Sequence, residues 1–184
     1  MFHLSTVYGG HDEEGHGEDV YYPPTKTRLG LASKKGYLKT VKFCVLNGAD
    51  VDASDGEALE SASRWGHLEV VKFLIGRGAD VSAGDDNALI WASAYGHLDV
   101  VKFLIGSGAN VRAEDDESLI LASDRGHLEV VKYLIGVGAD MHAGDDYALR
   151  RASNNCHLDV VKFLIGSGAD VHAFGDESLT LASG

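Results

Sequence analysis

The stretch GHLDVVKFLIGSGANVRA, residues 96–113, decides the fold because it recurs along the chain. Close copies occupy residues 66–83, 126–143 and 156–173, and a looser copy, GYLKTVKFCVLNGADVDA, occupies residues 36–53. Each copy begins 30 residues after the previous one. A fixed period of about 20–50 residues is typical of a solenoid, in which each unit packs only on its neighbours. The repeat therefore predicts one elongated array.

Each unit is expected to hold two helices. In the third full copy, residues 87–94 predict a short first helix and residues 98–105 a second one. Asp86 precedes the first helix and is expected to cap its free N–H groups, while Gly96 ends it with a positive φ. All but two side chains of the second helix are apolar, so this helix must be covered on several sides. The predicted fold class is all-α.

These features together resemble the ankyrin repeat, whose pattern joins a finger turn, T-P-L-H, paired alanines, G-H, a V-V-x-L-L helix and a G-A-D-V-N-A exit. G-H stands at residues 66–67, 96–97 and 126–127, and G-A-[DN]-[VM] occurs five times. The leucine of T-P-L-H and the first alanine recur at Leu29, Leu59, Leu89, Leu119, Leu149 and Leu179, and at Ala32, Ala62, Ala92, Ala122, Ala152 and Ala182.

Two departures from the family pattern are informative. The period is 30 residues, against about 33 in the family, and the missing residues fall in the finger, so short turns are expected there. The Thr-Pro pair is absent. This shortened style is similar to the ankyrin arrays abundant in giant viruses of amoebae. The resemblance implies a solenoid of stacked helix-turn-helix units.

The chain divides at Pro23–Pro24, because consecutive prolines interrupt regular secondary structure. Residues 25–184 are expected to hold five full repeats and a C-terminal half repeat. Residues 1–24 form an acidic leader, read either as a degenerate repeat or as a flexible tail. Its charge of -5 opposes the +4 of residues 25–53, so it is expected to fold over the first repeat. The half repeat has no second helix, which leaves end-to-end stacking open.

Composition excludes several classes of function. The net charge of -12 argues against nucleic-acid and anionic-membrane binding. Two distant cysteines, Cys44 and Cys156, fit a reducing compartment. No secretory leader or apolar run of about 18 residues is visible. We therefore expect a cytoplasmic protein, or one in the cytoplasm of a host cell if its source is viral.

The candidate binding residues lie where the copies differ. Residues just before the G-H glycine line the concave surface in the family, so the resemblance implies that Trp65, Tyr95, Arg125 and Asn155 face a partner. The candidate surface also includes the variable residues Arg64, Asp124 and Asn154. Aromatic and arginine side chains favour binding hot spots. Trp91 and Leu121 are expected to pack instead.

Acidic finger turns are the second candidate surface. They are expected to present a ridge that steers a basic partner, and their residues are Asp85, Asp86, Asp115, Asp116, Asp145 and Asp146. A purely structural role in capping is the alternative.

No cofactor, metal or catalytic site is expected. The histidines of the G-H pairs recur by register, and His11 and His16 lack the H-E-x-x-H spacing. The serines that follow the alanine row, including Ser93 and Ser153, are expected to be small core residues. We therefore predict a non-enzymatic module that binds a protein segment in its concave groove, with a self-associating structural solenoid as the alternative.

Overall fold

A computed structural model describes residues 26–171 of the chain. This part contains ten α-helices and no strand, so the all-α prediction is confirmed. The helices are α1 (Lys26–Lys34), α2 (Leu38–Leu46), α3 (Ala53–Arg64), α4 (Leu68–Ile75), α5 (Ala83–Ala94), α6 (Leu98–Gly106), α7 (Ala113–Asp124), α8 (Leu128–Gly136), α9 (Ala143–Asn154) and α10 (Leu158–Ser167). The predictions for residues 1–24, and for the half repeat beyond residue 171, lie outside the described residues.

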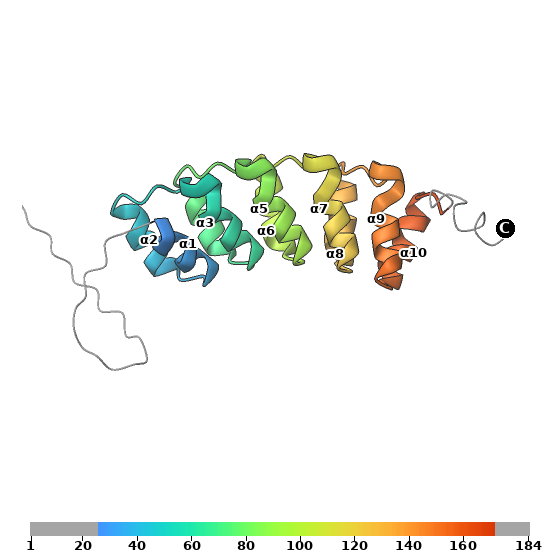
Figure 1. Cartoon of the computed structure of the whole chain (residues 1–184), viewed down its shortest axis with the longest axis horizontal. Helices are drawn as coiled ribbons and strands as arrows, with labels where there is room; N and C mark the ends of the chain where they lie inside the picture. Colours follow the sequence, from blue (N-terminus) through green and yellow to red (C-terminus); the bar gives the residue numbers. More distant parts are fainter. Residues whose placement is uncertain (1–25, 172–184) are drawn as a thin grey trace, which may run out of the picture.

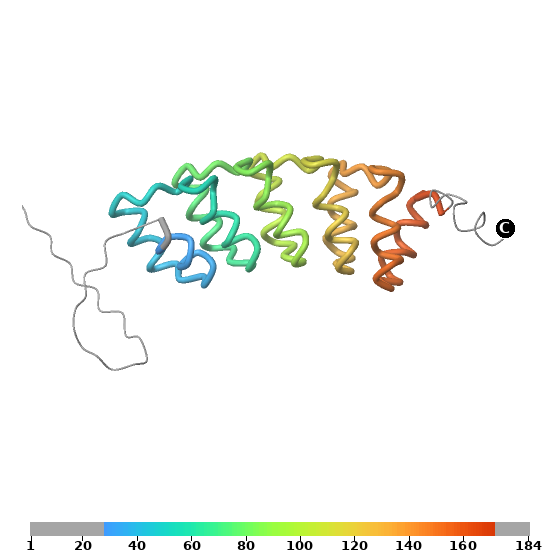
Figure 2. Tube along the Cα trace, in the orientation of Figure 1, coloured from blue at the N-terminus to red at the C-terminus, as the bar shows by residue number. Residues whose placement is uncertain are grey.

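The helices stack as consecutive pairs along one axis (Figures 1 and 2). Neighbouring odd-numbered helices contact one another extensively, whereas neighbouring even-numbered helices touch only sparsely. Two layers that differ in this way curve toward the more tightly packed one. The exposed side of α3, α5, α7 and α9 is therefore the inner side of the array, and we call it the groove face.

Two leucine rows form the core. One row comes from the odd helices and the other from the even helices, and all members are at most 1% exposed: Leu59, Leu89, Leu119, Leu149, Leu74, Leu104, Leu134 and Leu164. Fully buried leucines in equivalent places explain why the copies hardly differ there. The serine row is buried at Ser63, Ser93 and Ser123, as predicted. Ser153 is exposed, so its prediction as a core residue was wrong.

The finger turns have an unusual backbone. Each is three residues long, 54–56, 84–86, 114–116 and 144–146, and all three have left-handed φ and ψ before the odd helix begins its right-handed turns. Left-handed conformations cost most residues about 1–2 kcal/mol each, and Gly, Asn and Asp least. This explains why Gly and Asp fill most of these positions. The predicted short fingers are thus left-handed turns.

Two finger carboxylates, those of Asp86 and Asp116, tie the finger to the loop that follows the even helix of the same unit. Asp86 accepts the backbone N–H of Asn110 at 2.9 Å, and Asp116 accepts that of Asp140 at 2.8 Å. The prediction that Asp86 caps its own helix was therefore wrong. Gly56 replaces the aspartate in the finger of α3, and there Asp52 accepts the N–H of Asp80 instead, at 2.8 Å.

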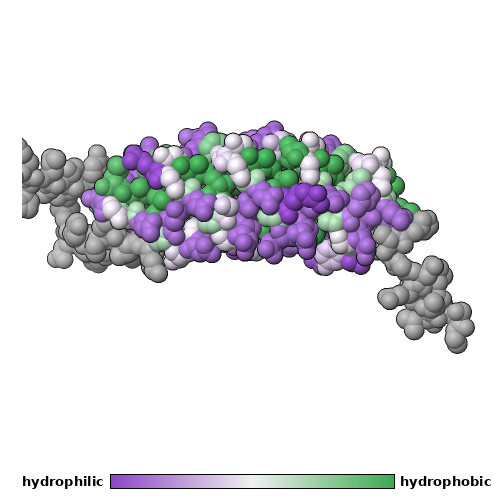
Figure 3. Space-filling model, turned by 90° about the horizontal axis from the view of Figure 1, so that it is seen from above, coloured by the Kyte–Doolittle hydropathy of each residue, from purple (hydrophilic) through white to green (hydrophobic). Residues whose placement is uncertain are grey.

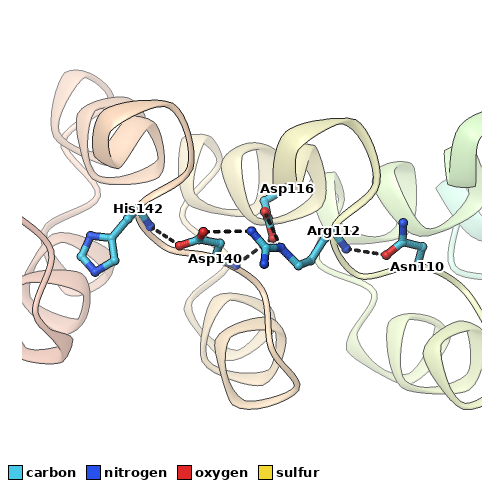
Figure 4. A network of polar contacts seen from close by, with 5 residues as sticks. All are labelled: Asn110, Arg112, Asp116, Asp140 and His142. Carbon is cyan, nitrogen blue, oxygen red and sulfur yellow. Dashed lines mark hydrogen bonds and ion pairs between the residues drawn. The ribbon is translucent and has the colours of Figure 1, made fainter.

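Figure 4 shows the polar contacts around one of these carboxylates, Asp116. The Arg112 guanidinium lies 2.9 Å from an oxygen of Asp140 and 3.4 Å from one of Asp116. The backbone N–H of Arg112 donates to Asn110, and that of His142 donates to Asp140. Arg112 thus joins its unit to the next one through Asp116 and Asp140.

Candidate partner-binding groove

Aromatic rings and one arginine form the centre of the groove face. The ring of Tyr95 stacks on that of Trp65 at 6.3 Å and lies 6.2 Å from that of Trp91. The Arg64 guanidinium lies 4.3 Å from the centre of the Trp91 ring and donates a hydrogen bond of 3.0 Å to the Tyr95 hydroxyl. Trp65 remains 48% exposed. Residues from two successive repeats thus form one ordered, accessible cluster.

Arg125 extends this cluster into the next repeat. Its guanidinium lies 4.4 Å from the centre of the Tyr95 ring. Hydrogen bonds from Arg125, and then from Arg64, lower the pKa of the Tyr95 phenol because they stabilise its charged form. Lys34 lies over the outer side of Trp65 at 5.6 Å. The structure therefore brings Arg64, Trp65, Tyr95 and Arg125 together.

The C-terminal part of the groove face is held by a different network. Asp124 pairs with Arg151 at 2.8 Å and accepts a hydrogen bond of 2.6 Å from the Asn155 amide. Arg150 lies 4.5 Å from the centre of the Tyr147 ring. Asn154 is exposed at the end of α9. Asp124 and Asn155 thus lie side by side and share a network with Arg151.

The six predicted finger aspartates fall into two groups. Asp85, Asp115 and Asp145 are exposed. Asp86, Asp116 and Asp146 are at most 5% exposed; the first two accept backbone N–H groups, and Asp146 lies 3.0 Å from Nδ1 of His142. Burial raises the pKa of Asp86, and the hydrogen bond from Asn110 opposes that rise. These three buried residues cannot form part of an accessible acidic ridge, which corrects their assignment as binding residues.

A surface cavity of about 450 Å³, open to solvent, lies between α5 and α7 on the groove face. It is lined by Asn87, Ile90, Trp91, Glu114, Glu117, Leu121 and Arg125. Trp91 and Leu121, predicted to pack, are half-buried and form part of its wall. Glu114 lies in one of the acidic finger turns, whereas Glu117 was missed by sequence reasoning. The available signal was the difference between copies at the column that holds Glu57, Asn87, Glu117 and Tyr147.

The histidines of the G-H pairs join repeats. The Nε2 atoms of His67, His97 and His127 lie 3.0–3.1 Å from backbone carbonyl oxygens of the preceding unit. Burial lowers the pKa of His127, against the effect of its hydrogen bond. Among residues 26–171, no group of three His, Cys, Asp or Glu side chains could hold a metal ion.

Each of these rings lies over the glycine of the preceding turn. A Cβ on Gly96, which has φ +75°, would lie 2.6 Å from Nδ1 of His127. Cys156 replaces this glycine in the last described unit and keeps the left-handed backbone, with φ 60°. The side chain of Cys156 is exposed.

Comparison with known families agrees with this architecture. The model for ankyrin repeats in three copies matches three overlapping segments, residues 11–85, 29–115 and 89–175. The chain belongs to the ankyrin-repeat family. Ankyrin repeats are generally protein–protein interaction modules and are typically not enzymes. No curated protein matches the chain. Within residues 26–171, none of the helices is long and apolar enough to cross a membrane.

Hydrophobic and hydrophilic surfaces run side by side along the array. Seen from above, on the long side of the array that carries the finger turns, a band of hydrophobic residues lies beside a hydrophilic band (Figure 3). Such a surface can contact a partner through apolar and polar groups at once.

Proposed function

We propose that this chain is a non-enzymatic protein-interaction module that binds a segment of a partner protein along its groove face. The observation that carries this proposal is the cluster of Arg64, Trp65, Tyr95 and Arg125, in which Trp65 and Arg125 are exposed, Arg64 and Tyr95 are half-buried, and the side chains are ordered by their own contacts. Aromatic and arginine side chains supply most hot spots in protein interfaces.

Preorganisation strengthens the proposal. A side chain that must be immobilised on binding costs about 0.5–1.5 kcal/mol. Tyr95 already holds its ring against Trp65 and its hydroxyl near Arg64. Such a surface loses little freedom when a partner docks.

The exposed finger residues favour a basic partner. Asp85, Asp115 and Asp145 are exposed on successive fingers, and the chain carries a net charge of -12. Complementary charge mainly accelerates encounter and is screened by salt. Partner binding is therefore expected to weaken as salt is raised.

A random-peptide display selection on the immobilised protein supplies a defined ligand. The affinity of a selected peptide is then measured by calorimetry for the wild type and for the Trp65→Ala/Tyr95→Ala/Arg125→Ala variant. Loss of a hot spot costs about 2 kcal/mol or more, so we expect affinity to fall at least about 30-fold.

The matched control carries three exposed substitutions on the even helices, Lys72→Ala/Lys102→Ala/Lys132→Ala. These lysines lie on the outer layer, away from the groove face. The control is expected to bind like the wild type. Equal binding by the groove variant, with its helical content intact by circular dichroism, would sink the groove assignment.

A second candidate function is end-to-end stacking of copies. The flank of α10 supports it, because Leu158 is 60% exposed and Ile165 is 44% exposed there. Cys156 opposes it, because its Cβ occupies the place where the ring of a further unit would lie. In light scattering, a mass that rises with concentration would favour stacking, and a constant monomer mass would exclude it.

We also propose a cytoplasmic location, or the host cytoplasm if the source is viral. Cys44 and Cys156 are both free thiols, the first buried and the second exposed, which fits a reducing compartment. Fluorescence microscopy of the tagged protein tests this location, and secretion into the medium would contradict it.

A further inference from the structure

The cavity between α5 and α7 has two chemically different parts. Its floor is apolar and comes from Ile90, Trp91 and Leu121. Its end near the finger turn is acidic, because Glu114 belongs to that turn and Glu117 opens the right-handed part of α7. A ligand that fits must place apolar atoms on the floor and a positive group at the finger end.

The carboxylates of the acidic end form no ion pair within the described part of the chain, because Arg151, whose positive charge acts on Glu117, pairs with Asp124. Of residues 26–171, none forms an ion pair or a hydrogen bond with the side chain of Glu114 or Glu117. Burial raises the pKa of Glu117, and the negative charges of Asp124 and Glu114 raise it further, while Arg151 opposes them. Burial and the neighbouring negative charges both disfavour the charged form of Glu117, so a nearby cation would stabilise its carboxylate.

The opposite end of the cavity is already satisfied. Arg125 lines it, but its guanidinium is engaged by the ring and hydroxyl of Tyr95. The Trp91 ring already contacts one cation, since the Arg64 guanidinium lies 4.3 Å from its centre. Aromatic rings stabilise cations that approach their faces.

We propose that this cavity receives a lysine or arginine side chain of the bound partner segment. Its methylene groups pack on Trp91 and Leu121, and its charged head lies between the carboxylates of Glu114 and Glu117. A long cationic side chain has the required order of groups, because its apolar stem precedes its charge. This inference rests on the proposed function and names the partner chemistry of one subsite.

The test uses small probes first, namely Nα-acetyl-lysine methylamide, its arginine counterpart and the uncharged norleucine counterpart. Two-dimensional NMR of the full chain follows the Trp91 indole and the backbone amides of α7. We expect saturable chemical-shift changes at these signals with both cationic probes. The apparent affinity of the norleucine probe is expected to be at least about 10-fold lower. Equal titrations for all three probes would overturn the proposal.

Variants locate the charge. Glu114→Gln/Glu117→Gln removes the two carboxylates, and Glu69→Gln/Glu129→Gln removes two exposed carboxylates of the even helices with the same change in net charge. The cationic probes are expected to lose at least about 10-fold in affinity on the first variant and to bind the second like the wild type. An equal loss on both variants would mean nonspecific attraction and would also overturn the proposal.

A peptide selected on the groove separates this inference from the proposed function. Each of its basic residues is replaced in turn by norleucine, and one replacement is expected to weaken binding to the wild type at least about 10-fold but not binding to Glu114→Gln/Glu117→Gln. If binding depends on Trp65 and Tyr95 but on no basic residue, the cavity proposal fails and the proposed function stands. If replacing both Trp65 and Tyr95 by alanine leaves the affinity for the peptide unchanged, the proposed function fails.

Discussion

The even helices and the groove face of the odd helices differ in how freely their residues change from repeat to repeat. α6 reads LDVVKFLIG and α8 reads LEVVKYLIG, whereas the residues at the same two groove positions are Trp91 and Tyr95 in one unit and Leu121 and Arg125 in the next. Val101, Leu104 and their equivalents are fully buried on α6 and α8. Close packing permits little change, so repetition identifies the core and variation identifies the candidate binding surface.

The largest expected effect comes from matched leucine truncations in the two regions. Leu104→Ala removes a fully buried side chain from α6 and is expected to lower the free energy of unfolding by about 2–5 kcal/mol. Leu121→Ala truncates a half-buried cavity wall and is expected to cost clearly less. Urea denaturation measures both; equal costs would break the distinction between packing and binding regions.

Neighbouring finger aspartates sharpen the comparison at a single turn. Asp116→Ala leaves the Asp140 N–H and the Arg112 guanidinium without their buried acceptor, and should cost about 1–3 kcal/mol of unfolding free energy. Asp115→Ala changes an exposed side chain and should stay within about 0.5 kcal/mol of the wild type. Urea denaturation of both variants provides the measurement, and a costly Asp115→Ala would contradict the division of the fingers.

The turn glycine and its cysteine replacement give a smaller pair of effects. Gly96→Ala adds a Cβ at φ +75°, under the His127 ring, and should destabilise by at least about 1–2 kcal/mol. Cys156→Gly should stabilise by about 1 kcal/mol, because it relieves a left-handed cysteine. Cys156→Ser keeps the Cβ and serves as the control. Thermal unfolding in reducing buffer tests all three; stabilisation by Cys156→Ser as well would assign the effect to the thiol.

The period, the two helices of each unit and the leucine rows could be predicted because they follow from local pattern and packing. Residues 87–94 do form the right-handed part of α5, and α6 ends one residue beyond its predicted end. The hydrogen bonds that Asp86 and Asp116 accept could not be predicted, because a carboxylate before a helix fits the role of an N-cap equally well. The acceptor role of each carboxylate depends on where the loop after the even helix returns to the finger.

The candidate site was predictable only in part. Trp65, Tyr95 and Arg125 stood out because they differ between copies. The cavity escaped prediction because it lies between two helices, and its wall requires the distance between repeats as well as their sequence. Glu117 became a candidate only because the structure places it in one cavity lining with Leu121 and Trp91.

The central claim is that partner binding belongs to the groove face and not to the exposed surface of the even helices. The most direct test is an alanine scan of exposed residues on both surfaces, with calorimetric affinity for one selected peptide at each position. We predict losses above about 10-fold only among groove residues such as Trp65 and Arg125, and none at Lys72, Lys102 or Lys132. Comparable losses on the two surfaces, or losses confined to the lysines, would contradict the account.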